Sequence, residues 1–114
     1  MGKAQSLYDS NNYSEAYKQF EQIANSSSGG DSAEARYMMG ECLFNQKDYD
    51  KSIMQYQKII SQYPDTSKAP KAMLKQAMAF EKLADKETAK VIYKKLVKKY
   101  PGSSEAAAAQ EHLK

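Results

Sequence analysis

The sequence has few of the residues that cross-link a chain or carry chemistry. It has one cysteine, Cys42, so no intrachain disulfide can form. Its one histidine, His112, has no second histidine or cysteine beside it, so a zinc site of the ordinary kind is not indicated. The glycines of the stretch NSSSGGD at 25–31 lack the lysine and the preceding strand of a phosphate-binding loop. These absences argue against an enzyme, a metal site and a cofactor.

Long apolar runs and strand-like alternation are also missing. No run approaches the roughly 18 apolar residues of a membrane-spanning helix, so we expect no direct membrane insertion. The first ten residues, MGKAQSLYDS, lack the apolar segment of a secretory signal. The chain begins in what looks like the middle of a repeat, so we expect a fragment of a larger protein. Period-2 alternation is not sustained anywhere, which favours an all-α fold.

The overall charge is modest. The 114 residues carry 17 basic and 14 acidic side chains, for a net charge of +3, which is too small to argue for nucleic acid. Charged residues make up 27% and hydrophobic residues 41%, as in an ordinary globular domain. The length fits a single domain.

A pattern of small and large residues recurs three times. Small residues lie at Ala4, Gly40 and Ala77, which are 36 and 37 residues apart, and another small residue follows 12 positions after each. Large apolar residues follow at fixed offsets, and two of the three copies end in Tyr-Pro, at 63–64 and 100–101. The later members of the pattern are Ala16, Ser52 and Ala89, then Phe20, Tyr56 and Tyr93, then Ile23, Ile59 and Leu96.

This spacing resembles the tetratricopeptide repeat, a helical hairpin whose helices approach closely at small residues while an aromatic fills the space beside them. The resemblance covers nearly the whole chain. It implies an all-α superhelix of about three hairpins, at 1–31, 32–66 and 67–101, with a capping helix at 102–114. Arg36 and Met73 stand where the family often has tryptophan, and Ser28 stands where it has proline.

Turn and cap signals place the helix boundaries. We expect helices over about 3–11, 14–24, 32–46, 48–63, 67–83, 86–100 and 105–113. The polar stretch 25–31 is predicted to be a loop, with Asp31 or Ser32 capping the third helix. Pro70 is tolerated because it lies in the first turn of its helix, and Ser103 or Ser104 caps the last one.

The resemblance also implies a binding surface, because the first helix of each hairpin lines the concave side of such arrays. An apolar strip edged by charges is expected to hold an extended or helical peptide of a protein partner. The alternative is that Tyr8 and Phe44 pack on neighbouring helices. Glu41 and Met78 replace the residues that bind a C-terminal carboxylate in chaperone-binding members, so such a clamp is not expected. The predicted concave-face residues are Tyr8, Tyr37, Glu41, Phe44, Asn45, Lys71, Leu74, Met78 and Lys82, with Glu34 and Lys75 along the edge.

Other chemistry-bearing residues have plainer interpretations. Cys42 is expected to be a buried small apolar residue rather than a nucleophile. His112 is expected to be solvated or weakly packed. Five lysines form a basic stripe on the sixth helix, and a solvated convex face is favoured over a nucleic-acid or anionic-lipid patch because no arginine or exposed aromatic is interleaved. The stripe comprises Lys90, Lys94, Lys95, Lys98 and Lys99.

The endings YPDTSKAPKAM at 63–73 and YPGSSEAAAAQ at 100–110 carry a finer resemblance. They are similar to the C-terminal tetratricopeptide domain of the YbgF/CpoB family of Tol-Pal accessory proteins and to the BamD family of outer-membrane assembly lipoproteins. This resemblance implies a scaffold of the bacterial cell envelope, in the periplasm, that docks another envelope protein. A cytoplasmic location is the alternative. The alternative role is a structural spacer or a homo-oligomerisation module within a larger protein.

Overall fold

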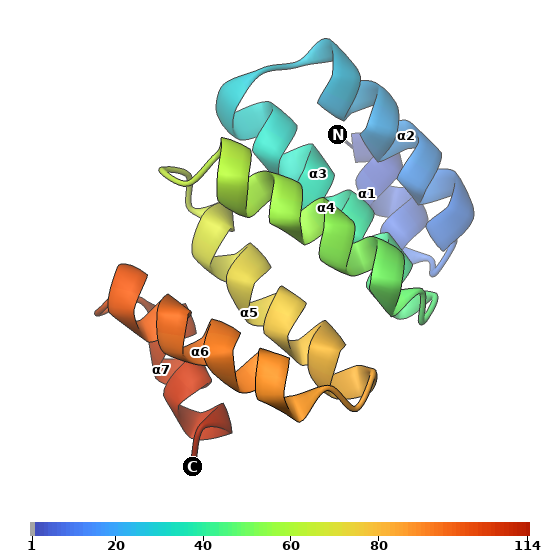
Figure 1. Ribbon diagram of the computed structural model, residues 1–114. Helices are drawn as coiled ribbons and strands as arrows, with labels where there is room; N and C mark the ends of the chain where they lie inside the picture. The colour runs from blue at the N-terminus through green and yellow to red at the C-terminus, as the bar shows by residue number, and fades with distance from the viewer. Residues whose placement is uncertain (1) are drawn as a thin grey trace.

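The computed structural model describes residues 2–114, and over that range it consists of seven α-helices without a strand (Figure 1). Each helix packs on the next one along the chain, and α7 contacts both α5 and α6. The helices α1, α3 and α5 form one layer and α2, α4 and α6 the other, which confirms the predicted all-α superhelix of hairpins. The bounds are α1 (Gly2–Asp9), α2 (Tyr13–Ser26), α3 (Gly29–Asn45), α4 (Tyr49–Gln62), α5 (Lys68–Lys82), α6 (Lys86–Lys99) and α7 (Ser104–His112).

The segment between α2 and α3 is shorter than predicted. We predicted a loop over 25–31 with Asp31 or Ser32 as the cap, but α2 continues to Ser26 and α3 begins at Gly29, with Ser28 as the N-cap. Ser32 is buried inside α3, where its hydroxyl donates to the Ala24 carbonyl at 3.0 Å. Because Ser32 packs on α2, α3 begins about one turn earlier than predicted. The burial of this residue outweighs the local preference of serine and glycine for turns.

Two other helix starts agree with the sequence signals. Pro70 lies in the first turn of α5, where the missing N–H interrupts no intrahelical bond. Ser103 is the N-cap of α7, and its hydroxyl accepts from the Ala106 N–H at 3.0 Å. None of the helices in the described range is long and apolar enough to cross a bilayer.

The core of each hairpin forms around an aromatic ring on its second helix. Phe20, Tyr56 and Tyr93 occupy equivalent places and are at most 1% exposed. The Tyr56 ring lies directly against Gly40, because a Cβ at Gly40 would be 2.6 Å from Tyr56 Cε1. The predicted role of Gly40 as a packing contact is confirmed.

The tyrosines of the two Tyr-Pro endings take part in hydrogen bonds that link each hairpin to the one before it, Tyr100 directly and Tyr63 through Ser32. The Tyr100 hydroxyl donates to the Pro64 carbonyl at 2.7 Å. The Tyr63 hydroxyl donates to Ser32 Oγ at 3.1 Å, and Ser32 passes the link on to the Ala24 carbonyl of α2. These bonds hold neighbouring hairpins together beyond their apolar contact.

We expect Tyr100→Phe to lower the free energy of unfolding by about 1 kcal/mol, because it removes the bond to Pro64 and leaves the ring in place. Urea unfolding followed by circular dichroism measures this. Tyr49→Phe is the matched control, since the Tyr49 hydroxyl makes no hydrogen bond to any described residue. Equal effects in the two variants would contradict a role for the Tyr100 bond.

Candidate functional site

The predicted concave-face residues all lie on the layer formed by α1, α3 and α5. The four on α3 are spaced so that they share one helix face. None is fully buried, and Asn45 and Lys82 are exposed. Tyr8 is on α1, the group on α3 is Tyr37, Glu41, Phe44 and Asn45, and the group on α5 is Lys71, Leu74, Met78 and Lys82.

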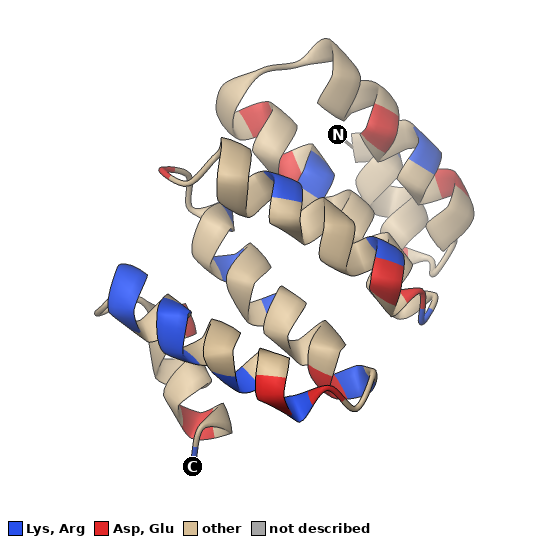
Figure 2. Cartoon of the chain, viewed as in Figure 1, with Lys and Arg blue, Asp and Glu red and all other residues tan. Residues whose placement is uncertain are grey.

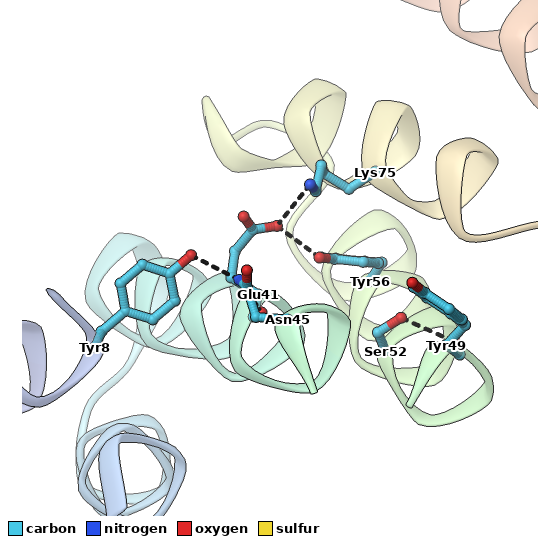
Figure 3. Close-up of polar contacts among 7 residues, drawn as sticks. All are labelled: Tyr8, Glu41, Asn45, Tyr49, Ser52, Tyr56 and Lys75. Carbon is cyan, nitrogen blue, oxygen red and sulfur yellow. Dashed lines mark hydrogen bonds and ion pairs between the residues drawn. The ribbon is translucent and has the colours of Figure 1, made fainter. Parts of the chain in front are cut away.

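Glu41 is the centre of a polar cluster in this layer (Figure 3). The Tyr56 hydroxyl reaches through from α4 and donates to Glu41 Oε1 at 2.6 Å. The Lys75 Nζ approaches the same oxygen from α5 at 3.8 Å. The side chains of Glu41 and Lys75 are only 14% and 20% exposed, so water screens this ion pair less than it screens a surface pair. Three helices thus converge on one carboxylate.

Asn45 joins this cluster to α1. Its Nδ2 donates to the Tyr8 hydroxyl at 3.0 Å and to the Glu41 carbonyl at 2.8 Å (Figure 3). The Tyr8 ring also meets Tyr13 edge to face, with ring centroids 5.4 Å apart. Tyr8 therefore packs on α2 with its ring and reaches α3 with its hydroxyl.

Lysines lie over the two aromatic rings on α3. The Lys75 Nζ is 3.8 Å from the centroid of the Phe44 ring, and the Lys68 Nζ is 5.1 Å from that of Tyr37. Phe44 also meets Tyr49 edge to face at 5.2 Å. The rings of Tyr37 and Phe44 are half-buried against the apolar cluster around Tyr56. One part of the Phe44 ring therefore packs on neighbouring helices, and the other part stays accessible to a ligand.

The four predicted residues of α5 do not contact one common partner. The Lys71 Nζ donates to Glu105 Oε2 of α7 at 3.0 Å. Burial raises the pKa of the Glu105 carboxyl, but the hydrogen bond and charge of Lys71, together with hydrogen bonds at the start of α7, outweigh burial and hold the pKa below its usual range. Leu74 and Met78 pack partly buried on the core of the third hairpin. Lys82, at the end of α5, makes no polar contact with the Glu41 cluster or with any other described side chain.

The phenols of Tyr37 and Tyr56 are neutral, and that of Tyr56 donates to Glu41. Burial, and then the nearby Glu41 carboxylate, raise the pKa of Tyr56 above its ordinary value. The same two causes raise the pKa of Tyr37. Both hydroxyls therefore stay protonated at neutral pH, and the site can bind and orient a ligand but offers no ionised phenolate.

Cys42 and His112 are placed differently. Cys42 is fully buried, and burial followed by the charge of Glu41 raises the pKa of its thiol to about 12, which fits the predicted apolar role. His112, expected to be solvated or weakly packed, is exposed and also makes defined contacts. Its ring stacks on Tyr93 with centroids 4.6 Å apart, and its Nδ1 lies 3.3 Å from Glu81 Oε1. No group of three metal-binding side chains occurs among residues 2–114.

Sequence reasoning missed the role of the Tyr56 hydroxyl, because its position was assigned to the core. The equivalent Tyr93 likewise donates to a carboxylate on the first helix of its hairpin, Glu81, at 2.8 Å. A tyrosine where the first hairpin has Phe20 indicates a hydroxyl with a partner. The pairing of Lys71 with Glu105 depends on how α7 docks and has no such signal.

Residues 34–66 and 71–103 each match the family model of the tetratricopeptide repeat. The chain belongs to the tetratricopeptide repeat family. The two matches span most of the hairpins α3–α4 and α5–α6, while α1 and α2 lie outside them. Tetratricopeptide repeats are generally protein–protein interaction modules, typically non-enzymatic, and domains of this kind bind protein partners. No curated protein sequence matched the chain.

Proposed function

We propose that the face formed by α1, α3 and α5 binds an extended or helical segment of a partner protein. The observation that carries this proposal is the convergence of Glu41, Tyr56 and Lys75 beside partly exposed aromatic rings. A fixed polar centre with apolar surface around it suits a segment that inserts apolar side chains and hydrogen-bonds at one point.

The charges of this face limit the kind of partner. Lys71 and Lys75 are already paired with Glu105 and Glu41. Neither lysine is available as an unpaired cation for a terminal carboxylate, and Glu41 would repel one. Affinity would therefore come from apolar anchors against Tyr37, Phe44 and Met78.

The test is the variant Tyr37→Ala/Phe44→Ala/Met78→Ala against a partner recovered with the wild-type domain. Loss of aromatic anchors at the centre of an interface should weaken binding by about 100-fold or more. The matched control is Met54→Ala/Val91→Ala, which removes exposed apolar side chains from the other layer. Unchanged affinity of the triple variant, with helicity intact, would refute the proposal.

We further propose that the protein is a bacterial cell-envelope scaffold of the Tol-Pal accessory type, periplasmic or envelope-associated. The support is the Tyr-Pro endings at 63–64 and 100–101, which resemble the YbgF/CpoB and BamD families. Fractionation of cells that make the complete gene product tests this, and recovery in the cytoplasm would overturn it. Light scattering addresses the alternative role, because a self-association module would show a mass that rises with concentration.

A further inference from the structure

A hollow lies between α4 and α6, in the layer opposite to the proposed binding face of α1, α3 and α5. It has a volume of about 400 Å³. Ile60 of α4 and Met73 of α5 form its apolar floor, and the side chains of Lys95, Lys98 and Lys99 of α6 line its edge. Figure 1 shows α5 behind the space that separates α4 from α6. The hollow is therefore a feature of the junction between the second and third hairpins.

The preceding junction, between α2 and α4, is built differently. Met73 corresponds to Arg36, which lies 37 residues earlier and is half-buried, with its Nε enclosed. The positions of Lys98 and Lys99 correspond to Ser61 and Gln62. At the α2–α4 junction, an arginine side chain thus stands where the α4–α6 junction has the Met73 thioether. Two of the three lysines that line the hollow are replaced by uncharged residues at that junction. Lys58 corresponds to Lys95, so of the two junctions compared the α4–α6 junction has the methionine floor and the larger number of lysines.

The lysines at this edge are not neutralised. Within residues 2–114, no carboxylate lies in ion-pair distance of Lys95, Lys98 or Lys99. On the other face, Lys71 and Lys75 each have a glutamate partner. Figure 2 shows the basic residues gathered at the C-terminal end of α6. The Lys99 Nζ lies 5.6 Å from the centroid of the Tyr100 ring, a contact that leaves its charge in place. Cations without carboxylate partners beside an apolar floor are complementary to a ligand that has both carboxylates and an apolar group.

We propose that this hollow binds an acidic segment of a partner protein that inserts one apolar side chain against Ile60 and Met73. A recess accepts a protruding side chain, whereas attachment to a bilayer needs apolar groups that protrude from the protein. Nucleic acid is disfavoured, because the edge holds no arginine and Tyr93, the aromatic of α6, is buried. From the sequence we predicted that the lysines of α6 form a solvated face, because the sequence does not reveal that Ile60 and Met73 lie beside them.

The experiment uses three labelled dodecapeptides: glutamates around a central phenylalanine, the same peptide with serine at the centre, and glutamines around phenylalanine. Binding is followed by fluorescence anisotropy at physiological salt. We expect the first peptide to bind about 10-fold more tightly than either of the others, because it alone has both the anchor and the charge. No detectable binding of the first peptide, or equal binding of all three, overturns the proposal.

A pair of variants on one helix separates the hollow from general electrostatics. Lys95→Gln/Lys98→Gln removes two charges at the hollow, and Lys90→Gln/Lys94→Gln removes two charges on α6 that do not line it. We expect the first variant to bind the peptide of glutamates around phenylalanine about 10-fold more weakly than the wild type does. The second variant should lose about 2-fold in affinity or less at this salt concentration. Equal losses would show diffuse attraction and overturn the proposal.

Two further measurements locate the ligand and distinguish this site from the proposed function. Ile60→Trp should fill the hollow and abolish binding, with thermal unfolding as the check on folding. The variant Tyr37→Ala/Phe44→Ala/Met78→Ala should bind the peptide as the wild type does, because it changes the other face. Binding to phosphatidylglycerol vesicles or to a DNA duplex in place of the peptide overturns the proposal.

Discussion

Gly40→Ala is expected to lower the free energy of unfolding by about 1–3 kcal/mol. The new methyl group would lie 2.6 Å from Tyr56 Cε1, which is closer than real Cβ atoms come to another heavy atom. The ring cannot move aside cheaply, because Tyr56 is fully buried and its hydroxyl is fixed on Glu41. Helix propensity alone predicts the opposite sign, since alanine is favoured over glycine by about 1 kcal/mol.

Gly30→Ala in the same helix is the matched control. A Cβ at Gly30 would meet nothing within 4 Å, so only the helix propensity remains. We expect this variant to be more stable than the wild type by up to about 1 kcal/mol. Urea unfolding of both variants measures the difference. If both variants had the same increase in the free energy of unfolding, the α3–α4 contact would accommodate a methyl group without destabilisation. Gly40 would then not be required at this contact.

The domain is expected to lose stability steeply as the pH rises above about 9. Burial and then Glu41 raise the pKa of the Cys42 thiol to about 12, from 9.0 when it is free of the fold. A folded pKa above the unfolded value means that stability is fully present below pH 9 and is lost as the pH rises toward 12. The raised pKa values of Tyr37, Tyr56 and Tyr93 act in the same direction.

For the thiol alone, the loss between pH 8 and pH 11 is about 2–3 kcal/mol, at 1.36 kcal/mol per pKa unit. Urea midpoints measured across this range test it. Cys42→Ala is the control: its absolute stability is lower, but its midpoints should fall less steeply with pH because the tyrosines alone remain. Parallel pH profiles for the two proteins would show that Cys42 contributes nothing to the alkaline loss.

The hairpin frame could be predicted from sequence because close packing restricts residue size. Gly40 and Tyr56 form a contact that needs a small and a large partner at fixed spacing, and such a pattern repeats along the chain. The start of α3 could not be predicted, because serines and glycines favour turns locally and only the packing of Ser32 on Ala24 reverses that preference. Tertiary contact decided that boundary.

The candidate site was predictable in part for a similar reason. Helical spacing places Tyr37, Glu41 and Phe44 on one face without knowledge of their neighbours. Their partners come from other helices, and contacts such as Lys75 with Phe44 depend on how the hairpins stack. The same holds for His112, whose stacking on Tyr93 follows from the docking of α7. The sequence thus predicts which residues share a helix face, whereas their contacts with other helices depend on how the hairpins pack.

The tyrosine bonds between hairpins also have a direction. Tyr100 donates to Pro64, and Tyr63 acts through Ser32 on Ala24, so in each case the final acceptor precedes the donor in the chain. A ribosome therefore releases every acceptor before the hydroxyl that needs it. The N-terminal part of a chain emerges first during synthesis, so each acceptor is already present when the hairpin that uses it leaves the ribosome. This order of donors and acceptors is compatible with docking of the hairpins one by one during translation.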